Sequence, residues 1–273
     1  MVVGPHLDGQ GTGRAEFMPF GGGWIAESGH GPRKDWLDSI SWRPETEMEI
    51  RVDVRKRVGV IARDILNAQP SGLAEARHVV EQIERWLREN RQDILVSVHD
   101  HCGWQGVRSY ALAVACLMMN FAHHAGHTRD YVLEMGLAGL LHNIGKLTIP
   151  AEILDKPGRL DAVQAQIMRG HAESGDQLLE RWGLASSMVV AASRHHYEKL
   201  DGSGYPVGLV TKHIAEPVRA APICDVYDAL ISSRSYKPVW SSAMALDEMC
   251  RTRGNFDPDL LAVFARSLRP AML

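Results

Sequence analysis

Side chains able to bind a metal ion occur at four places along the chain. They are His142 followed by Asn143, then His171, then the pair His195 and His196, and finally Asp225. Each place lies on, or at the end of, a segment with the apolar pattern of a core-facing helix. In helical proteins, metal sites are built from inward-facing side chains on several helices. Imidazole and carboxylate ligands suit iron, manganese, nickel or zinc.

The spacing of these residues favours two metal ions over one. Adjacent residues on a helix project about 100° apart, so two neighbouring ligands serve two different ions more readily than a single ion. Two metal ions about 3.5–4 Å apart are a common arrangement for phosphodiester hydrolysis. A lone histidine on an apolar helix is more often a buried core residue, and this holds for His171 taken alone. The order and spacing of the whole set therefore support the metal site.

Two longer motifs contain these histidines. Residues 139–150 read Gly-Leu-Leu-His-Asn-Ile-Gly-Lys-Leu-Thr-Ile-Pro, and residues 195–206 read His-His-Tyr-Glu-Lys-Leu-Asp-Gly-Ser-Gly-Tyr-Pro. They resemble the HDxGK and HHExxDGxGYP motifs of the HD-GYP family, metal-dependent phosphodiesterases that degrade the bacterial messenger cyclic di-GMP. His171 matches the histidine between the two motifs, and residues 224–237 and 254–258 match two later signatures. The resemblance covers about residues 105–268.

This resemblance implies an all-α helical bundle of the HD superfamily that binds a divalent metal. The expected metal is iron or manganese, in a binuclear centre if the ligand set is complete, with one ion or none as the alternative. The ligand positions fall on His142, His171, His196 and Asp225. Asn143 falls at the catalytic position of the HD pair, where the family has aspartate.

The resemblance also implies cyclic di-GMP as the ligand. A chain with a formal charge of −3 needs local cations to bind this dianion. Lys146 matches a lysine near the substrate phosphate, and Arg234 and Lys237 match positions that hold the phosphates of the dinucleotide. Tyr205 lies in the GYP loop, beside the substrate or a partner protein. The family implies a diguanylate cyclase domain as that partner.

Several ligand positions depart from the family pattern. Asn143 offers an amide oxygen without the negative charge of a bridging carboxylate. Tyr197 stands at the second histidine of the HHE triplet, and a phenol, with an ordinary pKa of about 10, is a poor replacement for imidazole. His195 replaces it only if the helix slips by one residue. Tyr110 and Gly106 stand where family members carry a histidine and a glutamate.

Other histidines are weaker candidates. The HD pair His99–Asp100 lacks the following glycine and lysine, and is typical of a polar turn. His123, His124 and His127 are typical of the C-terminal end of a helix, where cationic residues are stabilised. His101 is an alternative ligand that nothing in the sequence demands.

Three functions fit the motifs. The first is a phosphodiesterase that opens cyclic di-GMP to pGpG, or degrades it further to GMP. The second, which Asn143 and Tyr197 favour, is a degenerate HD-GYP domain in cyclic di-GMP signalling that binds the dinucleotide or a partner with weak or no hydrolysis. The third is another HD-superfamily phosphohydrolase acting on nucleotides such as ppGpp, and the GYP loop argues against it.

The apolar pattern predicts the elements that position these residues. Residues 1–45 are rich in glycine and predict a flexible arm. Residues 46–100 predict an N-terminal helical region, and residues 101–273 the HD-GYP domain. Residues 110–121 predict a central helix, apolar over most of its surface. One helix is expected over residues 163–182, with His171 within it.

Further helices are expected near residues 185–197, 216–233, 241–251 and 257–267. On the first helix of the N-terminal region, Ile61, Ile65 and Leu66 are expected on one buried face. Strand-like alternation occurs only at Ile50, Val52 and Val54.

Composition sets limits on the partners and the compartment. The 273 residues, 45% of them hydrophobic, suffice for a sizeable core, and the charge of −3 indicates neither a nucleic-acid nor a membrane partner. We expect no signal peptide, and the longest apolar run, Tyr110–Ala122, is too short for a bilayer. The four cysteines form no CxxC pair. Cys116 and Cys224 lie in apolar runs, which indicates free thiols and the cytoplasm. The sequence leaves homodimerisation open.

Overall fold

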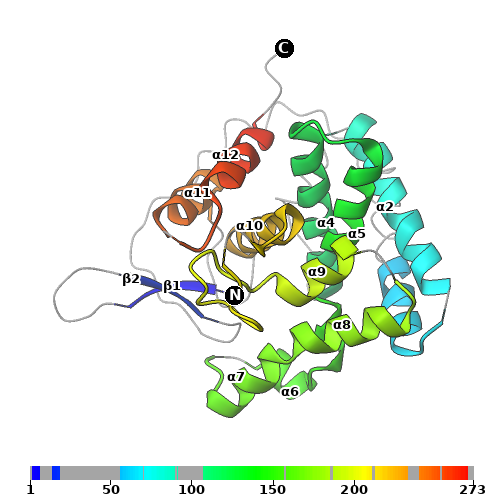
Figure 1. Ribbon diagram of the computed structural model, residues 1–273, viewed down its shortest axis with the longest axis horizontal. Coiled ribbons are helices and arrows are strands. Elements are labelled where there is room, and N and C mark those ends of the chain that lie inside the picture. Colours follow the sequence, from blue (N-terminus) through cyan, green and yellow to red (C-terminus); the bar gives the residue numbers. More distant parts are fainter. Residues whose placement is uncertain are drawn as a thin grey trace.

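Helices dominate the structure, a computed structural model of the chain, and the predicted all-α class is confirmed (Figure 1). The described residues are 2–6, 14–18, 56–69, 71–89, 91, 107–156, 158–184, 187–210, 213–232, 240–252 and 254–269. Within these ranges, no helix combines the length and the apolarity that a membrane crossing requires.

Helices α4 (Val107–His124) and α5 (Arg129–Leu141) pair at the centre of the bundle. Residues 112–122 are all buried, which confirms the central helix predicted from its apolar surface. Gly139 lets the two backbones approach closely, because a Cβ atom there would lie only 2.7 Å from the Cα atom of Ala115. The C-terminal end of α5, which leads into His142, is therefore held against the core.

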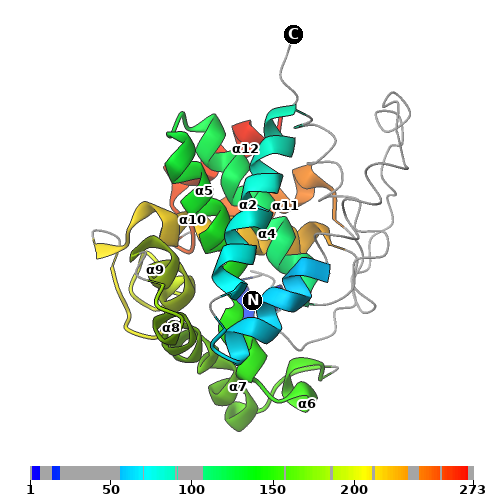
Figure 2. The same cartoon turned by 90° about the vertical axis from the view of Figure 1, so that its right-hand side faces the viewer.

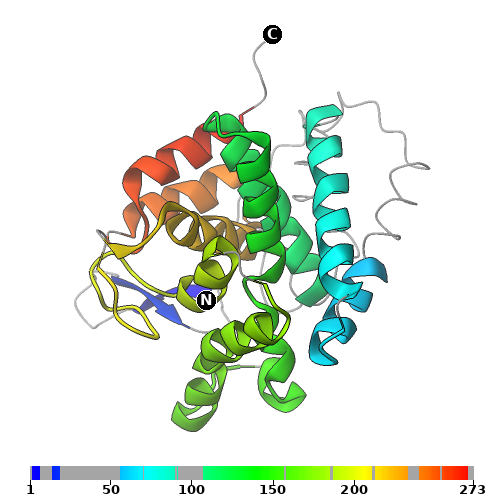
Figure 3. The same cartoon turned by 45° about the vertical axis from the view of Figure 1, so that its right-hand side comes forward.

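Helix α2 (Ser71–Glu89) packs beside α4 and α5, and a shorter helix at residues 56–66 precedes it (Figures 2 and 3). Ile61 and Ile65 are buried as predicted. Leu66 was expected on the same face, but 50% of its surface is exposed. The reason is geometric, since adjacent helical residues point about 100° apart and Leu66 therefore turns away from the face of Ile65.

A short 3₁₀ helix, η2 (Ile144–Thr148), follows α5 and packs against α8 (His171–Arg181). Glycine is required at this contact. A Cβ atom on Gly145 would lie 1.9 Å from the carbonyl oxygen of His171 and 2.6 Å from the backbone nitrogen of Gly175. The close approach brings the segment after His142 next to the start of α8.

The single helix predicted over residues 163–182 is two helices. Helix α6 (Ala151–Leu154) is followed by α7 (Ala162–Arg169), and α8 begins only after a break at Gly170. The side chain of Val163 is 70% exposed, so the apolar period that suggested one continuous buried face was misleading. The break places His171 at the first turn of α8, where its ring is buried.

Four helices complete the described part of the chain, and they fall close to the predicted ranges: α9 (Ser187–His195), α10 (Glu216–Ile231), α11 (Ser242–Arg251) and α12 (Pro258–Ser267). Helix α10 is buried along most of its length, so that Asp225 faces the interior of the bundle. Asp257 begins α12 by accepting hydrogen bonds from the backbone N–H groups of Asp259 and Leu260.

Two short strands, β1 (Val2–His6) and β2 (Arg14–Met18), form an antiparallel ladder. They lie within residues 1–45, for which a flexible arm was predicted, and no strand was predicted there. The alternation at residues 50–54 lies outside the described residues. The division into an arm, an N-terminal helical region and an HD-GYP domain stays a prediction.

Candidate metal centre

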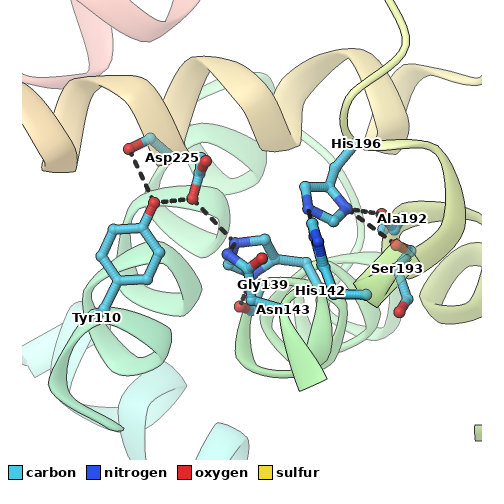
Figure 4. A network of polar contacts seen from close by, with 9 residues as sticks. Tyr110, Gly139, His142, Asn143, Ala192, Ser193, His196 and Asp225 are labelled. Carbon is cyan, nitrogen blue, oxygen red and sulfur yellow. Dashed lines mark hydrogen bonds and ion pairs between the residues drawn. The ribbon is translucent and has the colours of Figure 1, made fainter. Parts of the chain in front are cut away.

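The four predicted metal ligands converge in the interior of the bundle, and Figure 4 shows three of them, His142, His196 and Asp225. His142 follows α5, His171 begins α8, His196 follows α9, and Asp225 lies in the middle of α10. None of the four is more than 2% exposed. The His142 Nε2 atom lies 3.0 Å from Asp225 Oδ1, and the His171 Nε2 atom lies 3.4 Å from His196 Nε2. The four donors therefore form two pairs.

Backbone carbonyl groups fix the orientation of the three imidazole rings. Each ring places its Nδ1 atom 2.6–3.0 Å from carbonyl oxygens three or four residues earlier: His142 at Gly139, His171 at Met168, and His196 at Ala192 and Ser193. A carbonyl oxygen only accepts hydrogen bonds, so the proton resides on Nδ1. Each Nε2 atom is left to face the shared interior, as in histidines that bind metals.

The paired nitrogen atoms need a cation between them. Two Nε2 lone pairs 3.4 Å apart repel each other unless they share a positive charge. A proton does not supply it readily, because burial lowers the pKa of His171 to about 3 and lowers that of His196 as well. A divalent metal ion satisfies both nitrogens, so the donors present fit a metal.

The His142–Asp225 pair has the same requirement. His142 turns its Nε2 atom toward Asp225 Oδ1, and the two atoms fit together only with a cation between them, either a second ring proton on Nε2 or a metal ion. Burial alone would raise the pKa of Asp225, but the hydrogen bond and charge of His142 hold it well below its ordinary value. Asp225 is thus an ionised carboxylate, the form that binds metals.

Two neutral side chains, those of Asn143 and Tyr110, also lie at the centre. The Asn143 Nδ2 atom lies 2.6 Å from His142 Nε2, whereas the buried Asn143 Oδ1 has no hydrogen-bond partner. Turning the amide would present this oxygen to an ion. The Tyr110 hydroxyl donates a hydrogen bond to Asp225 Oδ1, so the residue that the spacing placed at the upstream histidine position does reach the site. In the described part of the chain, no three His, Cys, Asp or Glu side chains are already arranged around one ion.

The sequence model of the family described as HD domain matches residues 89–260, more than half of the chain. The chain belongs to the HD domain family. Its GYP motif, together with the relatives below, places it in the HD-GYP branch, which confirms the resemblance seen in the sequence.

Curated relatives of this HD-GYP chain carry names of cyclic dinucleotide phosphodiesterases. Cyclic di-GMP phosphodiesterase PA4108 of Pseudomonas aeruginosa is 34% identical over 216 residues, which are 78% of this chain and 52% of the relative. The 3'3'-cGAMP-specific phosphodiesterase 2 of Vibrio cholerae is 38% identical over 54% of this chain and 29% of its own length. The chain thus spans about half, or less, of the length of each of these relatives.

The HD-GYP fold is also found by structural comparison. The solved structure of Bd1817, described as a HDG"Y"P protein from Bdellovibrio bacteriovorus, superimposes with a TM-score of 0.64. The match covers 81% of this chain and 71% of that chain at 16% sequence identity. At this identity the likeness supports the fold alone.

Tyr197 replaces the second histidine of the HD-GYP triplet and is buried beside the remaining ligands. Its ring centroid lies 5.1 Å from that of His171 and 4.3 Å from that of His196, and it stacks on Tyr205 at 4.8 Å. His196, not His195, faces His142 and His171, and the His195 Nδ1 atom lies 3.6 Å from the carboxylate of Glu198. The helix has not slipped, and an aromatic ring occupies the position where the family has an imidazole.

Glu198 anchors the GYP loop, a role that the sequence motif alone did not reveal. Its carboxylate accepts hydrogen bonds of 2.7–3.2 Å from the backbone N–H groups of three consecutive residues, 207–209. Gly204 is required nearby, since a Cβ atom there would lie 2.3 Å from the backbone nitrogen of Lys199. The loop holding Tyr205 is therefore fixed from within the motif. An acidic residue just before a glycine-rich loop was the available signal.

The structure places one of the three predicted phosphate-binding cations. Lys146 lies in η2, is only 5% exposed, and its Nζ atom is 5.7 Å from the centre of the Tyr110 ring. Arg234 and Lys237 lie outside the described residues, as do residues 99–106. His127 lies just after the C-terminal end of α4, where its Nε2 atom is 3.0 Å from Glu216 Oε1, and it does not contribute to the candidate metal centre.

Proposed function

We propose that this chain is a degenerate HD-GYP domain that binds a cyclic dinucleotide, cyclic di-GMP first, and hydrolyses it slowly or not at all. One observation supports this above all. The four strong donors fall into two pairs, and the residue beside them, Asn143, carries no charge. The named activities of the relatives support the ligand class.

The proposed metal ligands are His142, His171, His196 and Asp225, with Asn143 Oδ1 as a weaker donor. Nitrogen and carboxylate donors suit Fe(II) or Mn(II). A bound divalent ion would supply positive charge for the phosphate oxygens and lower the pKa of a bound water. The side chains have separate tasks: Lys146, Arg234 and Lys237 offset the charge of the phosphates, and Tyr205 offers a ring to the ligand.

The substitutions at residues 143 and 197 explain why hydrolysis is expected to be slow. A carboxylate between two cations offsets their mutual repulsion, and the neutral amide of Asn143 does not. Tyr197 removes an imidazole and fills its place with a buried ring. Changes in residues that merely support ligands cost about 10–100-fold in affinity or activity, so the loss of two ligands should cost more.

The second candidate is an active phosphodiesterase that forms pGpG or GMP. The orientation of the three imidazoles favours it, because such an arrangement is what a working metal site requires. The proposed partner, a diguanylate cyclase domain, would dock at the GYP loop, where Val207 and Val210 are exposed. Buried free thiols at Cys116 and Cys224 support a reducing, cytoplasmic setting.

The test restores the family residues. The assay supplies each purified protein anaerobically with Fe(II) or Mn(II) and cyclic di-GMP, and measures pGpG by chromatography. The proteins compared are the wild type, Asn143→Asp, and the double variant that combines Asn143→Asp with Tyr197→His. We expect turnover to rise at least about 100-fold in the double variant, as two ligands return. Asn67→Asp, at an exposed asparagine, is the matched control. Wild-type turnover equal to that of the double variant would favour the active enzyme instead.

A further inference from the structure

A column of stacked groups runs from the metal centre to the surface. The ring of His196 contacts that of Tyr197, and Tyr197 stacks on Tyr205 with only 9° between the ring planes. The guanidinium of Arg169 lies over the ring of Tyr205, with its Cζ atom 5.5 Å from the ring centroid. Exposure increases along the column, since Tyr197 is buried, Tyr205 is partly buried and Arg169 is exposed. The column therefore links the buried donors to a cation at the surface.

The charge of Arg169 has no acidic counterpart in the described structure. None of the ion pairs found between described residues involves it, whereas Arg194 and Arg219 are paired with aspartates. The ring of Tyr205 holds the guanidinium by a cation–π contact, which leaves its N–H groups available for an anion.

The position of Arg169 also ties it to the site. It is the last residue of α7, and only Gly170 separates it from His171, the first residue of α8. The polar partners of His171 and the ring partner of Arg169 thus fix both ends of a three-residue segment. Arg169 is therefore linked to His171 in two ways, along the chain and through the rings of Tyr205 and Tyr197.

We propose that Arg169 binds the second phosphate of the cyclic dinucleotide whose first phosphate faces the metal donors. The inference rests on the proposed function and extends it to a residue outside the HD-GYP motifs. A cyclic dinucleotide carries two phosphodiester groups, and Arg169 would add a further cation to Lys146, Arg234 and Lys237, which are proposed above to offset the phosphate charge. A planar guanidinium forms two parallel hydrogen bonds to phosphate oxygens, and its cation–π contact with Tyr205 restricts where the group lies before a ligand binds.

A helix-end effect is the alternative role for Arg169, because cations stabilise helix C-termini. Arg181 offers a matched control. It is an exposed arginine in the last turn of α8, as Arg169 is in the last turn of α7. A helix-end effect predicts equal consequences for Arg169→Ala and Arg181→Ala, whereas phosphate binding predicts a loss confined to the first.

The experiment is calorimetric titration of the full chain with cyclic di-GMP at two salt concentrations, with the melting temperature of each variant measured alongside. We expect Arg169→Ala to weaken binding about ten-fold or more and to reduce its salt dependence. Arg169→Lys, which keeps the charge but not the planar group, should lose less. Arg181→Ala should bind as the wild type does.

The outcomes separate the two proposals. If the wild type binds cyclic di-GMP and Arg169→Ala binds it equally well, the role of Arg169 is overturned and the proposed function stands. Equal losses in Arg169→Ala and Arg181→Ala would also overturn it, in favour of the helix-end effect. If the wild type does not bind a cyclic dinucleotide at all, the proposed function fails and this inference fails with it.

Discussion

Replacing Asn143 with aspartate places a negative charge in the interior of the metal centre. Residue 143 is only 4% exposed, and its Oδ1 atom has no hydrogen-bond partner among the described residues. Without metal, the new carboxylate would be a buried charge close to the carboxylate of Asp225, because both side chains lie beside the Nε2 atom of His142. A buried charge that lacks its partner costs about 3–5 kcal/mol. We therefore expect Asn143→Asp to be less stable than the wild type in the presence of a chelator.

Metal should offset most of this loss of stability. A charged oxygen beside His142 adds a strong donor, and we expect Mn(II) affinity to rise about 10–100-fold. A ligand present at 100 times its dissociation constant stabilises the fold by about 2.7 kcal/mol, so metal recovers most of the loss. The assay is thermal unfolding with chelator and with Mn(II), where the chelated variant should melt roughly 10 °C lower than the wild type.

The control for this prediction is Asn67→Asp, which adds the same charge at an exposed position. It should melt as the wild type does in both conditions. The reasoning would be refuted if chelated Asn143→Asp melted with the wild type and Mn(II) raised neither melting temperature, because residue 143 would then lie outside any metal centre.

Three further predictions concern pH, the GYP loop and the N-terminal helices. Burial lowers the pKa of folded His171 to about 3, so between about pH 3 and 6.5 this residue binds more protons in the unfolded chain than in the folded one. His171 alone should therefore lower the stability of chelated protein by about 1.4 kcal/mol per pH unit on acidification, and His196, whose pKa burial also lowers, adds to this loss. Denaturant unfolding from pH 7 to 5 measures the change, and a flat profile contradicts it. Glu198→Gln weakens the hydrogen bonds from the backbone N–H groups of residues 207–209, so it should speed hydrogen exchange there and weaken cyclic di-GMP binding about ten-fold. Unchanged exchange would show that Glu198 does not hold the GYP loop in place. Gly72→Ala should lower the free energy of unfolding by about 1–3 kcal/mol, because its Cβ atom would lie 2.2 Å from Trp182 Cζ2. Denaturant titration measures the loss. Adding Trp182→Phe to this variant should recover part of the loss only if that contact is the cause.

The sequence predicted the all-α class and most helices because their apolar patterns are strong. The central helix α4 is apolar nearly all round, which only a buried helix tolerates. The break at Gly170 was missed because Val163 and Ile167 continue the apolar period of α8 while being exposed. Local capping begins α7, because Asp161 accepts a hydrogen bond from the backbone N–H of Gln164, and the helix ends at the turn of Gly170, whose N–H donates to the carbonyl groups of Gln166 and Ile167. A pattern of apolar residues reveals neither boundary.

The metal donors were predicted because each is followed or preceded by a distinctive motif, and the structure brings all four together. Their pairing was not predictable, since it depends on how α8, α9 and α10 pack. Arg169 was missed for the same reason. It lies at the end of a helix without any motif, and only the fold brings it over the ring of Tyr205.

The most direct test of the account is a single-turnover reaction with wild-type protein in large excess over cyclic di-GMP, in Mn(II) or Fe(II), quenched over hours and analysed by chromatography. Excess protein ensures that the dinucleotide is bound, so binding and hydrolysis are separated. The account predicts that the ligand co-elutes with the protein before quenching and is recovered intact. Conversion to pGpG within seconds would contradict it, and would show that Asn143 and Tyr197 are compatible with an active phosphodiesterase.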